Sequence, residues 1–154
     1  LGDVYKRQMS EINQAHPDVR AVISVNKGLV TQASAAIPVV PLYFAILYKV
    51  MKRAGNHENC IQQIARLFTQ KLYTPEGFRT DENGFIRMDD YELLPEIQEE
   101  VKKCWKAVTT DTVNQYCDID GYWEDFYHMF GFHYSDIDYT QDVDANVEIN
   151  GIVM

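Results

Sequence analysis

Within residues 21–53 the pattern of hydrophobic positions changes from one typical of a strand to one typical of a helix. Ala21 to Val25 is a short, largely apolar and β-branched run, which is typical of a strand buried on both faces of a parallel sheet. A polar loop containing Gly, Thr, Gln and Ser follows it, and residues 37–53 then show apolar positions at helical spacing. In α/β folds, ligands sit on loops of this type beyond the carboxyl ends of strands, although many such units bind nothing.

Downstream of this unit the pattern predicts mainly helices. Further helices are expected over residues 59–73 and 95–108, and two short ones are expected to end at Tyr116 and Phe130. The predicted starting residues are Asn56 for the helix over 59–73, Thr110 or Asp111 for the first short helix, and Asp120 for the second. The apolar stripe predicted to face inward on the helix over 59–73 comprises Ile61, Ile64, Ala65, Leu67, Phe68 and Leu72.

The remaining segments are expected to be extended or irregular. Phe85 to Met88 is predicted to be a short extended segment, and in the helix over 95–108 the inward residues are expected to be Ile97, Val101, Cys104, Trp105 and Val108. From Phe132 the chain is acidic and irregular, with an edge strand expected at Val147 to Val153. The acidic residues of this tail are interpreted as a solvated surface, because they lack the glycine and final glutamate of a calcium loop.

Length and charge exclude several classes of protein. The 154 residues suffice for one domain with a moderate core. The net charge of −9, with scattered basic residues, argues against nucleic-acid binding, which needs clustered Lys and Arg. The longest apolar run, Ala35 to Tyr48, is interrupted by Pro38 and Pro41 and is shorter than the ~20 residues of a membrane span. A buried helix is the better interpretation.

The cysteines and histidines match no metal or redox motif. Three cysteines, an odd number with no ligand spacing, predict reduced thiols and a cytoplasmic protein. The four histidines are not spaced as a ligand set, so no metal site is predicted.

Several motifs together resemble one enzyme family. The loop and following helix from Lys27 to Tyr43 are similar to the NADH-dependent trans-2-enoyl-CoA reductases, also called V-type enoyl-acyl carrier protein reductases. The resemblance extends over nearly everything from Ser24 onward, through the motifs His57-Glu58, Ile64 to Phe68, Lys71 to Tyr73, Asp89 to Leu93, Gly121-Tyr122 and Phe130 to Phe132.

The resemblance implies a fold and an activity. It implies the C-terminal part of a Rossmann-like, short-chain-dehydrogenase-type α/β fold, mostly helical here with one or two strands. The full-length enzyme would be a monomer that uses NADH to reduce the trans-2 double bond of enoyl-CoA or enoyl-acyl carrier protein in fatty acid biosynthesis. Residues 1–8 fit nothing that follows and are interpreted as a sequence artefact, which leaves 9–154 as the C-terminal portion of one reductase domain.

The resemblance also assigns residues to the site. The backbone from Leu29 to Thr31, including Val30, would contact the carboxamide of the cofactor, and the Thr31 side chain would reach its pyrophosphate. The candidate wall for the acyl chain comprises Ile37, Tyr43, Phe44 and Leu47. The alternatives are that Thr31 and Ser34 cap the next helix and that the four wall residues are ordinary core.

The catalytic groups of the family are expected to be absent from this chain. Tyr43 and Lys52 have the family's Tyr-x8-Lys spacing, but nine helical steps place them on roughly opposite faces, and the family pair precedes the loop. No G-x-G-x-x-G motif occurs, so the pyrophosphate cradle is also missing. The chain alone is therefore predicted to be inactive, to bind NADH negligibly, and to be poorly stable with exposed strand edges and apolar faces.

Two alternative functions are open at this point. One is a non-enzymatic helical module that binds acyl chains or a protein through residues 37–50, but such a module has no need of a strand entering a polar loop. The other is a different short-chain dehydrogenase, against which the long matching tail after Gly55 argues.

Overall fold

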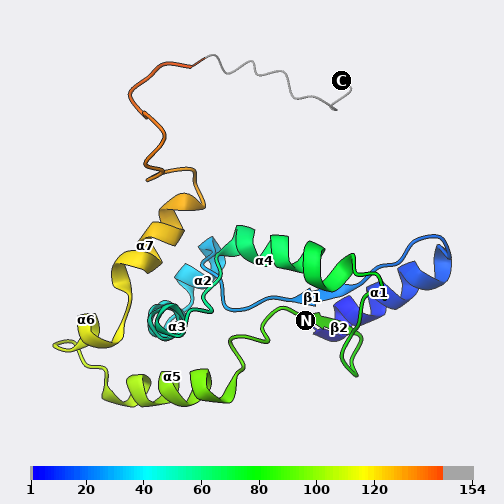
Figure 1. Cartoon of the computed structure of the whole chain (residues 1–154), viewed down its shortest axis with the longest axis horizontal. Coiled ribbons are helices and arrows are strands. Elements are labelled where there is room, and N and C mark those ends of the chain that lie inside the picture. The colour runs from blue at the N-terminus through cyan, green and yellow to red at the C-terminus, as the bar shows by residue number, and fades with distance from the viewer. Residues whose placement is uncertain (1, 144–154) are drawn as a thin grey trace.

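The chain consists mainly of helices, together with a pair of short strands (Figure 1). The computed structural model describes residues 2–143. The elements are α1 (Gly2–Ala15), β1 (Ile23–Val25), α2 (Gln32–Ala36), α3 (Val40–Ala54), α4 (Cys60–Arg66), a π-helix (Leu67–Leu72), β2 (Phe85–Arg87), α5 (Pro95–Ala107), α6 (Val113–Tyr116) and α7 (Ile119–His128). The pair of strands lies between α1 and the group formed by α3, α5, α6 and α7 (Figure 1). The mostly helical α/β composition agrees with the fold predicted from sequence.

The two strands pair in parallel, with Ile23 opposite Phe85 and Val25 opposite Arg87. The pairing continues past β2, where the Met88 N–H donates to the Val25 carbonyl at 2.8 Å. The extended segment predicted over 85–88 is thus confirmed. Its role as the partner of β1 was not predicted, because the two strands are short and far apart in sequence.

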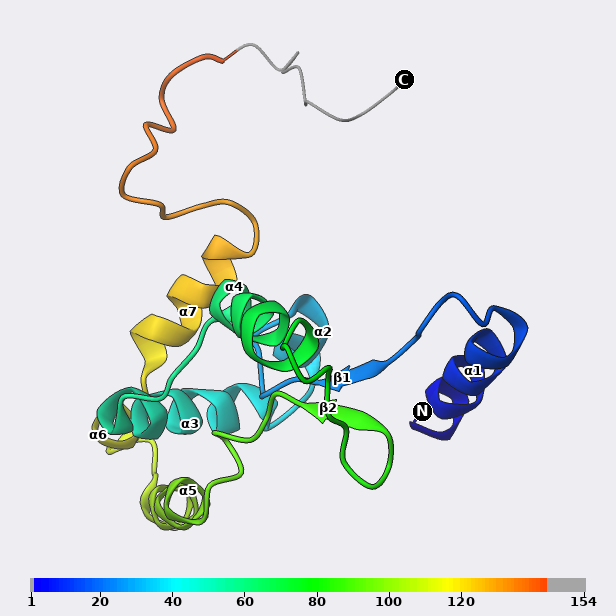
Figure 2. The same cartoon turned by 45° about the vertical axis from the view of Figure 1, so that its right-hand side comes forward.

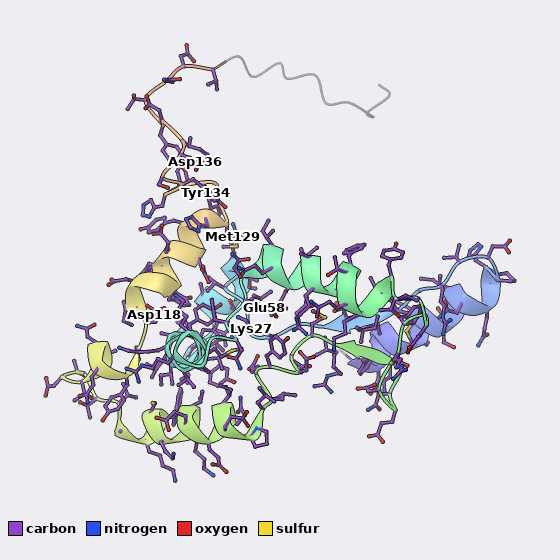
Figure 3. All side chains as sticks on the ribbon, in the orientation of Figure 1. Lys27, Glu58, Asp118, Met129, Tyr134 and Asp136 are labelled. Carbon is purple, nitrogen blue, oxygen red and sulfur yellow. The ribbon has the colours of Figure 1, made fainter. Side chains whose placement is uncertain are left out.

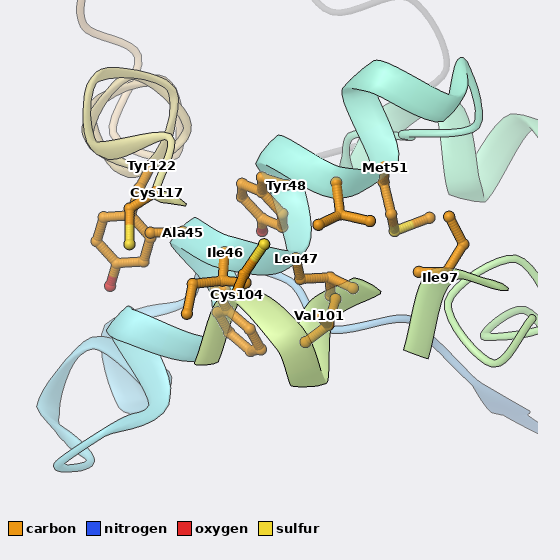
Figure 4. Packing of buried hydrophobic residues seen from close by; sticks show 12 residues of the cluster. Ala45, Ile46, Leu47, Tyr48, Met51, Ile97, Val101, Cys104, Cys117 and Tyr122 are labelled. Carbon is orange, nitrogen blue, oxygen red and sulfur yellow. The ribbon is translucent and has the colours of Figure 1, made fainter. Parts of the chain in front are cut away.

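Helix α3 forms the centre of the core, packed between α5 and α7 (Figure 4). Ile46, Leu47 and Tyr48 are completely buried on it. Side chains from α5 and α7 complete the cluster, and its further buried members include Ile97, Val101, Cys104, Cys117 and Tyr122. The predicted inward face of α5 is confirmed except at Trp105, which is exposed on a neighbouring face of that helix.

The ends of α3 follow from its proline and glycine residues. The helix begins at Val40 rather than at Ile37, because Val39 has a positive φ of 75° and Pro41 lies in the first turn. At the other end Gly55 adopts the left-handed conformation with φ 76°, and its N–H bonds the Lys52 carbonyl, as expected of a C-terminal cap.

The predicted inward face of α4 is wrong. Ile61 and Ile64 are 74% and 49% exposed, and Phe68 of the π-helix is 46% exposed, whereas Gln63 and Arg66 are 2% and 6% exposed. The physical reason is that Arg66 pairs with carboxylates of the underlying segments, which turns the polar side of the helix inward. The helix is capped by Asn59, whose side chain accepts from Gln62 N–H, and not by the predicted Asn56.

The predicted caps of the last two helices also need correction. Thr112, not Thr110 or Asp111, is the N-cap residue of α6, and Asp118, not Asp120, is that of α7. Asp118 accepts from Gly121 N–H at 3.2 Å and also pairs with Lys52 of α3. One carboxylate therefore begins α7 and connects that helix to α3.

Helix α1 lies at the edge of the molecule, joined to β1 by an extended segment (Figure 2). It runs continuously through the boundary at residue 8, and Lys6 of the presumed artefact donates to the Asn83 side chain at 3.0 Å. The assignment of residues 1–8 as an artefact stays a prediction. The edge strand predicted at Val147 to Val153 lies outside the described residues.

Two further features concern residues 2–143. No helix among them has the length and apolar character needed to cross a bilayer, and no group of three or more potential metal ligands gathers there. All three cysteines are free thiols, of which Cys104 and Cys117 are buried.

Candidate functional site

The loop that follows β1 is held by side chains from two other elements. Tyr48 of α3, which is fully buried, accepts a hydrogen bond from Val30 N–H at 3.1 Å. Its hydroxyl lies 3.4 Å from the Gly28 carbonyl, to which it donates. Burial raises the pKa of the Tyr48 hydroxyl, so it stays a neutral group that both donates and accepts. This tyrosine fixes the backbone on both sides of Leu29.

Glu92, located between β2 and α5, holds the same loop from another direction. One of its carboxylate oxygens accepts from Gly28 N–H and the other from the Tyr43 hydroxyl, each at 2.6 Å. The Glu92 carbonyl accepts from the Gln98 side chain at 2.8 Å. Burial, together with the bond to this carboxylate, raises the pKa of Tyr43 to about 12.

Gly28 is needed for its small size rather than for a special conformation. It does not have a positive φ, so a left-handed backbone conformation is not what selects glycine here. A Cβ atom at this position would lie 2.5 Å from Cε1 of Phe44. Phe44 is itself buried and stacked parallel to Tyr48, with ring centroids 6.1 Å apart. The loop therefore passes directly over the Phe44 ring.

The substitution Gly28→Ala should consequently destabilise the protein by about 1–3 kcal/mol, since the added methyl group overlaps a buried ring that has little room to move. Urea unfolding measures the change. The matched control is Gly77→Ala, where a Cβ meets nothing within 4 Å and the cost comes from the positive φ of 78° alone. An unchanged unfolding free energy for Gly28→Ala would contradict the close approach.

Thr31 and Ser34 form a capping box at the start of α2. The Thr31 side chain accepts from Ser34 N–H at 3.0 Å, and Ser34 Oγ accepts from Thr31 N–H at 2.8 Å. The expectation that these residues cap the next helix is confirmed. The Thr31 residue as a whole remains exposed, so capping does not bury its hydroxyl.

Lys27 is buried beneath the loop, with only 3% of its surface exposed (Figure 3). Its ammonium group lies 4.5 Å from the centroid of the Tyr48 ring and donates to the Gly28 carbonyl at 3.3 Å. Burial lowers the pKa of Lys27 to about 8, and the carboxylates of Glu92, Asp125 and Glu58 offset part of that effect. The loop therefore lies against the Lys27 ammonium group, and no carboxylate among the described residues forms a salt bridge with that group.

His57 also packs against the ring of Tyr48. Its ring centroid lies 4.6 Å from that of Tyr48 in an edge-to-face arrangement. Burial and the positive charges of Lys27 and Lys52 lower the pKa of His57 to about 4, so the imidazole is neutral near pH 7.

The structure separates the four residues expected to form an acyl wall. Tyr43 is partly buried and lines an open groove of about 560 Å³ between α3 and α5. Ile37 is exposed at the end of α2, whereas Phe44 and Leu47 lie inside the core. Leu29, Val30 and Thr31 are consecutive on the loop, as expected. The four wall residues do not share one surface.

Sequence reasoning missed three residues that shape the loop: Lys27, Tyr48 and Glu92. Lys27 and Glu92 belong to motifs noted for other reasons, and Tyr48 is the last residue of the apolar run that begins at Ala35. Their hydrogen bonds to the loop follow from tertiary packing. Tyr43 and Lys52 do bond different partners, Glu92 and Asp118, as expected of residues on opposite faces of a helix.

Two family models match the chain. Residues 3–73 match the model described as "Trans-2-enoyl-CoA reductase catalytic region", and residues 80–143 match "Enoyl reductase FAD binding domain". Over these two regions the chain is similar to enoyl reductases. The site loop falls within the first match and Glu92 within the second, so the candidate site combines residues from both matched regions.

Proteins similar to this chain carry related names. An enoyl-[acyl-carrier-protein] reductase [NADH] of Cytophaga hutchinsonii is 51% identical over 134 residues, which are 87% of this chain and 34% of that protein. The corresponding protein of Flavobacterium psychrophilum is 47% identical over the same shares. The Treponema denticola trans-2-enoyl-CoA reductase, solved in complex with NAD, superposes with a TM-score of 0.82 at 45% identity, covering 90% of this chain and 35% of that one. The chain spans about a third of the length of each.

Proposed function

We propose that this chain forms the C-terminal part of an NADH-dependent reductase of the trans-2 double bond of enoyl thioesters, carried by CoA or by acyl carrier protein, in fatty acid biosynthesis. The observation that carries the proposal is the loop after β1, which Tyr48 and Glu92 hold in place by hydrogen bonds. The loop lies in a region that is similar to proteins named enoyl-[acyl-carrier-protein] reductase [NADH]. The Treponema denticola structure, which holds NAD, has the same fold over this region.

The free backbone groups of the loop fit a nicotinamide carboxamide. Among residues 2–143 no hydrogen bond is formed by Leu29 N–H or by the Val30 carbonyl. A carboxamide offers one acceptor and two donors, so one free donor and one free acceptor complement it. In the proposal these groups orient the nicotinamide, Thr31 reaches the pyrophosphate, and NADH supplies the hydride when bound.

A flavin fits this chain poorly, although one matching family model carries FAD in its description. The pyrophosphate of a dinucleotide needs a glycine-rich cradle where the backbone can approach it closely. The glycines of the region 80–143 are Gly84, Gly121 and Gly131, and they lie in three separate segments of the chain. A bound flavin is therefore not part of the proposed function.

The substrate side of the proposal rests mainly on Tyr43. Its side chain lines the groove between α3 and α5, to which Pro95, Val101 and Trp105 contribute apolar surface. Ile37 extends the exposed apolar surface at the end of α2. Phe44 and Leu47, which are buried, would support this wall from inside the core rather than contact an acyl chain. Their role would be to exclude water and hold α3 in place.

The catalytic tyrosine and lysine of such a reductase would come from outside this chain. The sequence contains no G-x-G-x-x-G, and its Tyr43–Lys52 pair is engaged elsewhere. In the proposal the 154-residue chain alone shows no turnover and negligible NADH affinity, and the complete enzyme is a cytoplasmic monomer.

A chimera tests the proposal directly. This chain would replace the matching 134-residue segment of the Cytophaga hutchinsonii reductase, with which it is 51% identical. We expect the chimera to oxidise NADH in the presence of crotonyl-CoA at about a tenth of the parental rate or faster, because the segment supplies the same loop. The control is the isolated chain, which should leave NADH unchanged.

Two results would contradict this function. A chimera that melts cooperatively and elutes at the parental volume, yet reduces no enoyl thioester, would remove the enzymatic proposal and favour the binding module. Turnover by the isolated chain would show that the catalytic groups lie within it.

A further inference from the structure

One residue, Glu92, connects the three segments that border the candidate site through its carboxylate and its backbone carbonyl. Glu92 accepts from Gly28 N–H in the loop and from the Tyr43 hydroxyl on α3, and its own carbonyl accepts from Gln98 on α5. The loop and α3 also meet through the packing of Gly28 on Phe44 and through the hydrogen bonds of Tyr48.

The hydrogen bonds to the Glu92 carboxylate are short for side-chain contacts. Both bonds to the carboxylate are 2.6 Å long, which is the short range typical of hydrogen bonds to a charged acceptor. An ionised carboxylate is an acceptor at both oxygens, and here each oxygen meets one donor. Glu92 is also the first of the carboxylates that favour the charged form of Lys27 beneath the loop. The same side chain therefore bonds the loop backbone and balances its buried cation.

We infer that Glu92 is a positioning residue, which sets the place of the cofactor-binding loop by bonding Gly28 N–H while Tyr43 holds the other carboxylate oxygen. The inference rests on the proposed function, since it takes the loop after β1 to bind NADH. Gly28 directly precedes Leu29, whose N–H is the free donor proposed for the carboxamide. A shift at Gly28 would move that donor, so NADH binding should suffer more than the chemical step.

The chemistry of the side chain predicts a graded response. Glutamine keeps one acceptor for Gly28 N–H, and its amide can donate to Tyr43, whose hydroxyl also accepts. Leucine offers no acceptor and leaves Gly28 N–H without its partner. In the chimera we expect Glu92→Leu to raise the KM for NADH about tenfold while kcat changes less than about threefold, and Glu92→Gln to raise that KM less than about threefold.

Two further measurements accompany the kinetics. Glu82→Leu is the matched control, because Glu82 is exposed and forms no hydrogen bond within residues 2–143, and its KM for NADH should equal that of the unmodified chimera. Amide hydrogen exchange of the peptide covering residues 26–31 should be faster in Glu92→Leu than in Glu82→Leu. This second readout needs no enzymatic activity.

The outcomes separate this inference from the proposed function. If the unmodified chimera is inactive, the proposed function fails, and exchange in residues 26–31 still decides whether Glu92 holds the loop. If Glu92→Leu lowers kcat or the melting temperature while the KM for NADH is unchanged, Glu92 has a structural role only and the inference is overturned. If Glu92→Leu leaves hydrogen exchange in residues 26–31 unchanged, Glu92 does not hold the loop and the inference is likewise overturned. Should Glu92→Leu fail to fold, Glu92→Asp replaces it. Its side chain is shorter by one methylene, which draws the carboxylate away from both Gly28 N–H and Tyr43, so the same rise in KM is expected.

Discussion

Replacing Arg66 with methionine should lower the free energy of unfolding by about 3–5 kcal/mol, because it breaks a buried ion-pair network from its centre. The Arg66 side chain is 6% exposed and bonds Glu58 at 2.7 Å and Asp90 at 2.9 Å. It also donates to the Met88 carbonyl at 2.9 Å and lies 4.1 Å from the centroid of the Tyr91 ring. Methionine fills much of the volume but leaves Glu58, whose side chain is 14% exposed, without its cation.

The comparison for this prediction is Arg79→Met. Arg79 pairs with Glu76 on the surface, where the two side chains are 86% and 72% exposed, so the loss should stay below about 1 kcal/mol. Urea unfolding of the chimera, followed by circular dichroism, measures both variants. Equal losses for the two would mean that the Arg66 network contributes no more than a surface pair.

Replacing Lys27 with methionine should raise stability at pH 7 by about 1–3 kcal/mol. The pKa of Lys27 is about 8 in the folded chain, against 10.5 for an ordinary lysine, because burial disfavours its charged form. Between these two values the unfolded chain holds a proton that the folded chain has released, so stability rises with pH over this window. Below about pH 8 the folded chain carries the buried cation at its full cost. Methionine removes both the cost and the pH dependence.

Unfolding at pH 7, 8, 9 and 10.5 checks this prediction, again in the chimera. Lys103→Met provides the control, since the Lys103 side chain is 72% exposed and should leave the pH profile unchanged. A loss of stability at pH 7 in Lys27→Met would show that the contacts with Tyr48 and the Gly28 carbonyl outweigh the cost of burial. An undiminished rise between pH 8 and 10.5 would assign the titration to another group.

Local patterns predicted the parts of the fold that local physics decides. Helix α5 begins at Pro95 and ends within a residue of its predicted end, because its apolar spacing and its proline are properties of the segment itself. The inward face of α4 was wrong for the opposite reason. The helix does have an apolar stripe, but its buried side is determined by the ion pairs of Arg66 with Glu58 and Asp90. The spacing of apolar residues within the helix does not predict that pairing.

In the candidate site too, features of one segment were predicted and contacts between distant segments were not. The loop was recognised from its own residues, whereas the group that bonds Gly28 lies 64 positions later in the chain. Tyr48 looked like one more apolar residue of α3, and only its hydroxyl contacts with Gly28 and Val30 distinguish it. Such roles depend on which segments meet in space, which the spacing of residues along one segment does not encode.

The hydrogen bonds of the loop have a thermodynamic consequence for any ligand that arrives there. Because the amides of Gly28, Val30 and Thr31 are already bonded to Glu92, Tyr48 and Ser34, the backbone loses its conformational freedom when the protein folds. Association then requires little further ordering of the chain, so more of the contact energy appears as affinity. Substitutions at positions 48 and 92, which bond the loop from other elements, can therefore change the affinity for a ligand of the loop.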